Sequence, residues 1–265
     1  MKLFYRHYGE GQPLIILHGI FGISDNWVTL GKRLAEKFSV YIPDQRNHGQ
    51  SPHSVTFNYF ALADDLHEFI REHKLEKPMI IGHSMGGKVA MTFALEHPEM
   101  VDKLVVVDIS PRKYPGRNVH FDMISAMMAV NFEAVHSREE VEQLLETSIP
   151  NNRIRLFVMK NLYRKTRTTF DWRLNLEALS ANMDFVFDGV ESSDVYEGPA
   201  LFIRGGRSDY ISDADAPLIK KLFPRAEIQT IKKASHWVHA DAPAELCRLF
   251  SLFLGKECVA PGVED

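Results

Sequence analysis

Short apolar runs alternate with longer amphipathic stretches along most of the chain. Continuous apolar runs bounded by turn residues are typical of parallel strands that helices cover on both faces, so the pattern predicts an α/β fold. The predicted strands cover residues 3–8, 13–17, 40–42, 78–81, 104–107, 200–203 and 228–231, and the first two are expected to pair as a hairpin. Helical spacing of apolar residues predicts helices over 59–73, 88–96, 213–222 and 244–254.

The alternation lapses for the 87 residues of segment 111–197. Apolar spacing there is mostly helical and predicts helices over 121–135, 139–147, 152–163 and 174–182. We therefore expect a helical cap, or lid, inserted into a core domain. The core would consist of residues 1–110 and 198–255, and residues 256–265 are expected to form a flexible C-terminal tail.

A G-x-S-x-G motif, Gly82-His83-Ser84-Met85-Gly86, lies between a predicted strand and a predicted helix. This context is typical of a nucleophile elbow, in which a strained turn exposes a serine at the carboxyl edge of the sheet. Side chains two positions before and after the serine would collide with the neighbouring backbone, and glycine removes them. Ser84 is therefore the predicted nucleophile.

A serine hydroxyl needs a positioned base, and the base needs a carboxylate that orients it. His236 follows the last predicted strand, which fits the order serine, acid, histidine along the chain. Two carboxylates follow strands in the intervening sequence, Asp108 and Asp209. Asp108 is the preferred acid and Asp209 the alternative. His18, His48 and His83 lie beside glycines and are expected to bond the backbone instead.

An oxyanion hole requires two backbone N–H groups. Met85, the residue after the nucleophile, is expected to supply one of them. The loop His18-Gly19-Ile20-Phe21-Gly22 follows a predicted strand, and its glycines allow a close approach of the backbone to an anion. Ile20 is the expected second donor, with Phe21 as the alternative.

The chain resembles the α/β-hydrolases, and among them the YbfF-type esterases and related abhydrolase-domain serine hydrolases. The resemblance runs nearly end to end, and its matching stretches are HGIFG (18–22), DQRNHGQS (44–51), GHSMGGK (82–88), VDISP (107–111), WRLN (172–175), LFIRGG (201–206) and HWVHA (236–240). It implies an α/β-hydrolase fold with a mostly parallel sheet and a catalytic triad. Such relatives carry serine at the position of Ser208, which implies Asp108 as the acid with Ser208 near the histidine. Asp209 beside Ser208 keeps the alternative open.

Two features of the predicted cap bear on the substrate. It contains five of the ten methionines, which adapt to irregular apolar shapes, although plain cap packing also explains them. Seven basic residues and one acidic residue lie between positions 153 and 173, which favours either an anionic leaving group or a solvated helix face. The expected substrate-binding residues are Trp172, Arg173, Trp237, Met123 and Met127.

Composition and charge limit the partners, cofactors and location that we expect for this protein. With 31 basic and 35 acidic residues, the net charge of −4 supplies no global attraction for nucleic acid. The two cysteines, Cys247 and Cys258, have no zinc or redox spacing, and no apolar run is long enough for a membrane span. We expect a cytoplasmic protein, monomeric or homodimeric, that needs no cofactor or metal.

The predicted function is that of a serine hydrolase of the carboxylesterase kind, acting on small to medium acyl esters. The same machinery would cleave acyl-CoA thioesters, and a cofactor-free haloperoxidase or a carbon–carbon hydrolase would use the same triad. A protein that binds a ligand on this fold without turnover is the alternative of another class.

Overall fold

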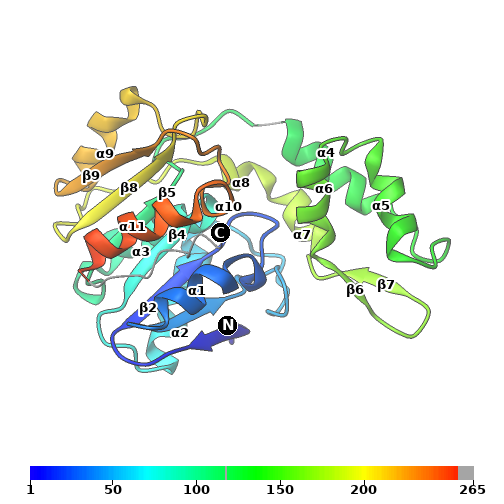
Figure 1. Cartoon of the computed structure of the whole chain (residues 1–265), viewed down its shortest axis with the longest axis horizontal. Coiled ribbons are helices and arrows are strands. Elements are labelled where there is room, and N and C mark those ends of the chain that lie inside the picture. Colours follow the sequence, from blue (N-terminus) through cyan, green and yellow to red (C-terminus); the bar gives the residue numbers. More distant parts are fainter. Residues whose placement is uncertain (117, 256–265) are drawn as a thin grey trace, which may run out of the picture.

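The computed structural model describes residues 1–116 and 118–255 and shows a seven-stranded sheet in the order β1-β3-β2-β4-β5-β8-β9 (Figure 1). β1 pairs antiparallel with β3, and the remaining neighbours pair in parallel. The strands are β1 (Tyr5–Tyr8), β2 (Pro13–Leu17), β3 (Ser39–Pro43), β4 (Met79–His83), β5 (Leu104–Val107), β8 (Ala200–Gly205) and β9 (Ala226–Ile231).

Helices cover both faces of this sheet, as continuous apolar strands require. Successive side chains of a strand point to opposite faces. In β5, Leu104 and Val106 pack into the cluster that contains apolar residues of α2, α3 and α9. Val105 and Val107 pack instead with apolar residues of α1 and α11. The sheet is thus buried on both sides, and its functional groups lie where strands end.

The helices divide between the core and the segment that joins β5 to β8. The core helices are α1 (Val28–Leu34), α2 (Tyr59–Glu72), α3 (Met85–Glu96), α9 (Ala216–Leu222), α10 (Val238–Asp241) and α11 (Pro243–Leu254), with short 3-10 helices at Ser24–Trp27, Pro98–Met100 and Asp213–Asp215. Among the described residues, no helix is both long and apolar enough to cross a bilayer.

The segment 111–197, here called the insertion, lies to one side of the sheet in Figure 1. It contains α4 (Asn118–Met128), α5 (Arg138–Glu146), α6 (Asn152–Met159), α7 (Leu176–Ala181), α8 (Met183–Phe187) and the antiparallel pair β6 (Leu162–Arg164) and β7 (Phe170–Trp172). The insertion is therefore mostly helical.

The predicted α/β architecture with a mostly parallel sheet is confirmed, but several local predictions differ from the structure. The first two strands form no hairpin with each other, because β3 lies between them and pairs with both. Helix α1 was not predicted. The helix predicted over 121–135 ends at Met128, and the helix predicted over 152–163 ends at Met159, where the chain turns toward β6. The predicted tail at 256–265, with Cys258, lies outside the described residues.

The two connections between insertion and core meet at one place. Val190 N donates to Pro111 O at 2.7 Å, and Tyr114 N donates to Phe187 O at 2.8 Å. Fully buried Lys88, on helix α3 directly behind the nucleophile motif, joins them to the core. Its Nζ donates to Arg112 O at 3.1 Å and to Asp188 O, one carbonyl on each connection.

We expect the stability contribution of Lys88 to depend on pH. Burial lowers the pKa of Lys88 to about 7, whereas an unfolded chain has an ordinary lysine pKa of about 10.4. Between these values the unfolded state binds more protons, so the cost of burying this amine is largest below pH 7 and fades as the pH rises. Urea unfolding at pH 7, 8 and 9 measures this effect. The free energy of unfolding of wild type should rise relative to that of Lys88→Met by up to about 1.4 kcal/mol per pH unit.

A difference in unfolding free energy that stays constant over this pH range would contradict the prediction. Because each protein is compared at the same pH, titration of the other groups cancels in the difference.

Candidate active site

Ser84 occupies the sharp turn between β4 and α3, with φ 53° and ψ −122°. Positive φ is strained for a serine, and such strain concentrates at functional sites. The turn is tight enough to require its glycines. A Cβ on Gly82 would lie 2.2 Å from Gly86 O, and one on Gly86 would lie 2.5 Å from Leu17 O. The backbone geometry is therefore that of a nucleophile elbow.

Asp108 follows β5, is fully buried and also has positive φ, at 52°. Its Oδ2 lies 2.8 Å from His236 Nδ1. Gly205 N donates to its Oδ1 at 2.8 Å, and Ser208 Oγ donates to Oδ2 at 2.5 Å. A carboxylate held by these donors favours the His236 tautomer with the proton on Nδ1, which leaves Nε2 free to act as a base.

The alternative acid, Asp209, lies one residue beyond this contact. Its backbone carbonyl accepts from Arg112 Nη2 at 3.1 Å, and it lines an outer pocket of about 330 Å³ together with His236. The carboxylate within hydrogen-bonding distance of the imidazole is that of Asp108.

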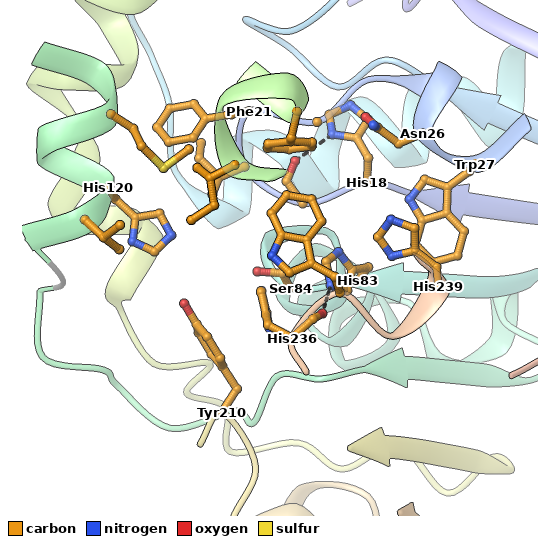
Figure 2. A pocket seen from close by; sticks show the side chains of 18 residues that line it. His18, Phe21, Asn26, Trp27, His83, Ser84, His120, Tyr210, His236 and His239 are labelled. Atoms are coloured by element: carbon orange, nitrogen blue, oxygen red, sulfur yellow. Dashed lines mark hydrogen bonds between the residues drawn. The ribbon is translucent and has the colours of Figure 1, made fainter. Parts of the chain in front are cut away.

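Two aromatic side chains orient His236 from its other sides. Tyr210 stacks on the imidazole with ring centroids 4.0 Å apart. His83 Nε2 lies 2.9 Å from the backbone carbonyl of His236 and donates to it (Figure 2). Burial lowers the pKa of His83 well below its ordinary value, so this ring is a neutral donor. The structure thus fixes both the ring and the backbone of His236.

Two hydrogen bonds to the backbone of Phe21 hold the loop of residues 18–22, which follows β2. Phe21 N donates to His48 Nε2 at 3.2 Å, and Phe21 O accepts from Asn161 Nδ2 at 2.8 Å. Phe21 has φ 59° and needs this support. Since the N–H of Phe21 already has an acceptor, Ile20 and Met85 are the donors that we retain for an oxyanion. Ile20 lines the same cavity as Ser84, and Met85 directly follows Ser84 at the start of α3.

The other expected backbone-bonding histidines behave as predicted. His18 Nδ1 donates to Gly19 O and its Nε2 accepts from Gln45 N, while His48 Nδ1 donates to Arg46 O. Burial lowers the pKa of His18 to about 4 and that of His48 to about 3, so both rings are neutral and can accept hydrogen bonds.

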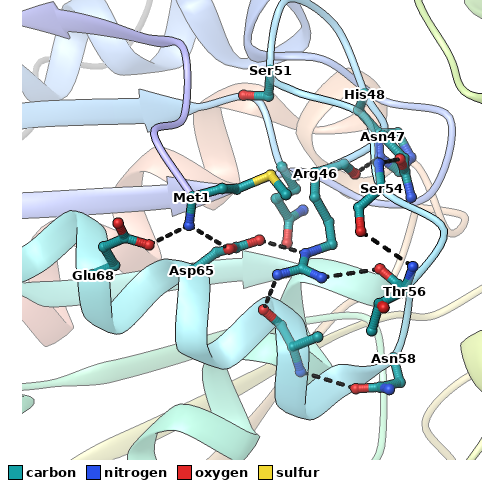
Figure 3. A network of polar contacts seen from close by, with 12 residues as sticks. Met1, Arg46, Asn47, His48, Ser51, Ser54, Thr56, Asn58, Asp65 and Glu68 are labelled. Atoms are coloured by element: carbon teal, nitrogen blue, oxygen red, sulfur yellow. Dashed lines mark hydrogen bonds and ion pairs between the residues drawn. The ribbon is translucent and has the colours of Figure 1, made fainter.

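The side chain of Arg46 holds the segment that carries His48 (Figure 3). Arg46 Nε lies 2.5 Å from Asp65 Oδ2, and its Nη atoms donate to Thr56 O and Ala61 O. Arg46 is buried, and all three of its guanidinium nitrogens donate hydrogen bonds, so it is a structural support for the loop.

The motif WRLN at 172–175 supports the same loops from the insertion. Trp172 Nε1 donates to Met127 O at 2.9 Å. Arg173 N donates to Asn161 O, and Asn175 N donates to Asn47 O. The motif therefore links the insertion to the loops around residues 21 and 47.

A cavity of about 200 Å³, here called the catalytic cavity, contains Ser84 and His236 in its wall (Figure 2). The core contributes most of its polar groups, and α4 and α6 of the insertion contribute mainly apolar side chains together with His120. Its lining residues are His18, Gly19, Ile20, Phe21, Gly22, Asn26, Trp27, His83, Ser84, Val119, His120, Met123, Ile154, Phe157, Tyr210, His236, Trp237 and His239.

Two of the five expected substrate-binding residues, Met123 and Trp237, line this cavity. Trp172, Arg173 and Met127 do not, because Trp172 and Met127 are buried against each other within the insertion and Arg173 lies over the Tyr163 ring.

Sequence reasoning missed several cavity residues, among them Tyr210, Phe157 and His239. Phe157 packs edge-on against Trp237 with centroids 4.3 Å apart, and His239 stacks on Trp27 at 4.5 Å. The helical spacing of Phe157 with Ile154 indicated only a buried face, and the sequence holds no signal for which cavity that face lines.

Comparison with known proteins agrees with this geometry. Residues 12–243 match the family described as alpha/beta hydrolase fold. The chain belongs to the α/β-hydrolase family. A structure described as a marine microorganism esterase superposes on this α/β-hydrolase with a TM-score of 0.93 at 43% identity, over 95% of this chain and 99% of that one.

Curated relatives of this α/β-hydrolase are named for the same kind of chemistry. The sn-1-specific diacylglycerol lipase ABHD11 of Danio rerio is 39% identical over 93% of this chain and 79% of its own length. Esterase YbfF of Escherichia coli is 32% identical over 92% of this chain and 94% of its own. The expected resemblance is confirmed, and these relatives support an ester hydrolase function.

Proposed function

We propose that this protein hydrolyses carboxylic esters through an acyl-enzyme on Ser84, with His236 as the base and Asp108 as the acid. The 2.8 Å contact between Asp108 Oδ2 and His236 Nδ1, beside a serine in strained elbow geometry, carries the proposal. The acid is buried, and the serine and histidine share one cavity wall.

In the first half-reaction, His236 Nε2 takes the proton of Ser84 Oγ as the oxygen attacks the ester carbonyl carbon. The carbonyl electrons move to oxygen, and the backbone N–H groups of Ile20 and Met85 stabilise the resulting oxyanion. When the tetrahedral intermediate collapses, the bond to the alcohol oxygen breaks. His236 returns its proton to that oxygen, so a neutral alcohol departs and the acyl group stays on Ser84.

In the second half-reaction, water replaces the alcohol. The water molecule attacks the acyl-enzyme while His236 takes one of its protons. His236 then returns that proton to Ser84 Oγ as the carboxylic acid product leaves. The developing imidazolium is stabilised by the Asp108 carboxylate, which stays ionised throughout.

The insertion acts in this proposal as the cap. Its α4 and α6 supply Met123, Ile154 and Phe157 to the catalytic cavity. An apolar wall favours the acyl chain, and a volume of about 200 Å³ suits a small to medium acyl group.

Labelling with a fluorophosphonate tests the nucleophile directly. We expect stoichiometric modification of folded protein, located at Ser84 by peptide mass spectrometry, together with loss of p-nitrophenyl butyrate hydrolysis. Heat-unfolded protein is the control, because the activated serine exists only in the folded site. Folded protein that hydrolyses no ester of a series from acetyl to palmitoyl and takes up no label would refute the proposal.

A further inference from the structure

A second cavity, of about 360 Å³ and here called the basic annex, lies against the catalytic cavity. It is bounded by α1, α6 and α10. Four residues line both cavities, namely Asn26, Phe157, Trp237 and His239. The two cavities are therefore adjacent, and a molecule that reacts at Ser84 lies beside the annex.

Positive charge reaches the annex from two sides. Arg33 comes from α1 of the core, Arg153 comes from α6 of the insertion, and Lys160 is the residue that caps the C-terminus of α6. Arg153, Leu156, Phe157 and Lys160 have the spacing i, i+3, i+4 and i+7, which places them on one face of the helix. The described residues that line the annex include these three cations and no acidic side chain.

The wall between the two cavities carries no charge of its own. Burial is the main cause that lowers the pKa of His239 to about 3. Arg153 and Lys160 line the annex together with His239, and their positive charges lower its pKa in the same direction, as His236 does. His239 is thus neutral near pH 7, and the charge available to a ligand is that of the arginines and the lysine.

Arg153 is partly committed to another contact. Its Nη1 lies 2.5 Å from Asp241 Oδ1, and Asp241 Oδ2 accepts from Ser235 N and Oγ beside His236. The guanidinium also lies 5.7 Å from the Trp237 ring. Arg153 therefore connects the annex to the loop of the proposed base. For this reason the test of the annex replaces Arg33 and Lys160 and leaves Arg153 unchanged.

We propose that the basic annex binds a carboxylate or phosphate group of the substrate, so that the preferred substrates are esters with an anionic group beyond the scissile bond. The inference rests on the proposed ester hydrolysis and specifies its substrate class. The anion belongs either to the acyl part or to the alcohol part, because both extend from the same carbonyl carbon at Ser84.

Two matched pairs of esters separate these sources. For the acyl part, 4-nitrophenyl hydrogen suberate is compared with its neutral methyl ester, 4-nitrophenyl methyl suberate. For the alcohol part, 1-butyrylglycerol 3-phosphate is compared with 1-butyrylglycerol. Within each pair the reacting ester is the same, so a ratio of kcat/KM values isolates the contribution of the anion.

Wild type is expected to favour the anionic member of at least one pair by about tenfold, mainly through KM, and the preference should shrink at high ionic strength. The double variant Arg33→Met with Lys160→Met should reduce this ratio to about one. Lys32→Met is the matched control, since Lys32 is an exposed cation on the same helix as Arg33 but outside the annex lining, and it should keep the wild-type ratio.

Equal or lower activity toward the anionic member in both pairs would overturn the inference and leave the proposed function standing. A preference that survives in the double variant would also overturn it, because the anion would then be bound elsewhere. Wild-type protein that hydrolyses none of the four esters and takes no fluorophosphonate label would overturn both proposals together.

Discussion

Replacing Ser84 by alanine is expected to lower kcat for p-nitrophenyl butyrate by at least about 10⁴-fold, with little change in KM. The side chain is only 7% exposed, and alanine removes just the oxygen that would form the acyl bond. The cavity lining residues Met123, Phe157 and Trp237 stay in place. Steady-state kinetics on wild type and variant, purified in parallel, provide the measurement.

The thermal unfolding midpoint of the same variant is the control for folding. A folded Ser84→Ala protein that keeps more than about a hundredth of the wild-type kcat would contradict the acyl-enzyme mechanism. The reaction would then need a nucleophile other than the elbow serine.

Replacing Asp108 by asparagine is expected to lower kcat by about 10³- to 10⁴-fold, whereas Asp209→Asn should lower it by less than about tenfold. Asparagine conserves the volume of the buried side chain but removes its charge. Gly205 N, Ser208 Oγ and His236 Nδ1 all donate to the Asp108 carboxylate. The N–H group of an asparagine amide at this position would face at least one of these three donors. The His236 tautomer would no longer be fixed, and its imidazolium would lose its counter-charge.

Matched kinetics of the two variants decide between the carboxylates. The reverse ranking, with Asp209→Asn the more damaging, would refute the assignment of Asp108. Ser208→Ala is a useful third variant, because it removes one donor to Asp108 and leaves the carboxylate itself in place.

The core of the fold could be predicted because its strands are encoded locally. A run such as residues 104–107 is apolar at every position, and only a strand covered on both faces buries all of it. Strand pairing is not encoded in this way. The strands at 5–8 and 13–17 are neighbours in sequence and read as a hairpin, yet β1 pairs with β3, whose register with Tyr5 depends on how the whole sheet assembles.

The insertion was harder to predict for a related reason. Its β6 and β7 have three residues each, too few for a period-two pattern to stand out, so residues 162–163 read as the end of a helix. The packing of this small sheet also decides the role of Trp172. Sequence reasoning placed that side chain at the substrate, but its Nε1 donates to a backbone carbonyl inside the insertion.

The proposed reacting groups, by contrast, were all identified from sequence. Ser84, Asp108 and His236 each follow a strand of the core, and the carboxyl ends of parallel strands converge on one edge of a sheet. Their positions therefore depend on the part of the fold that periodicity predicts well. The cavity walls depend on how α4 and α6 pack over that edge, which no local pattern determines.

The insertion connects β5 and β8, which are neighbouring strands of the sheet. The hydrogen bond from Val190 N to Pro111 O brings the start of the insertion close to a residue near its end, and β5 pairs directly with β8. Segments attached at two adjacent points can be exchanged at small entropic cost to the rest of a fold. Proteins with this core could thus acquire new specificities by replacing that module, provided that the new one donates to Phe21 O as Asn161 does here.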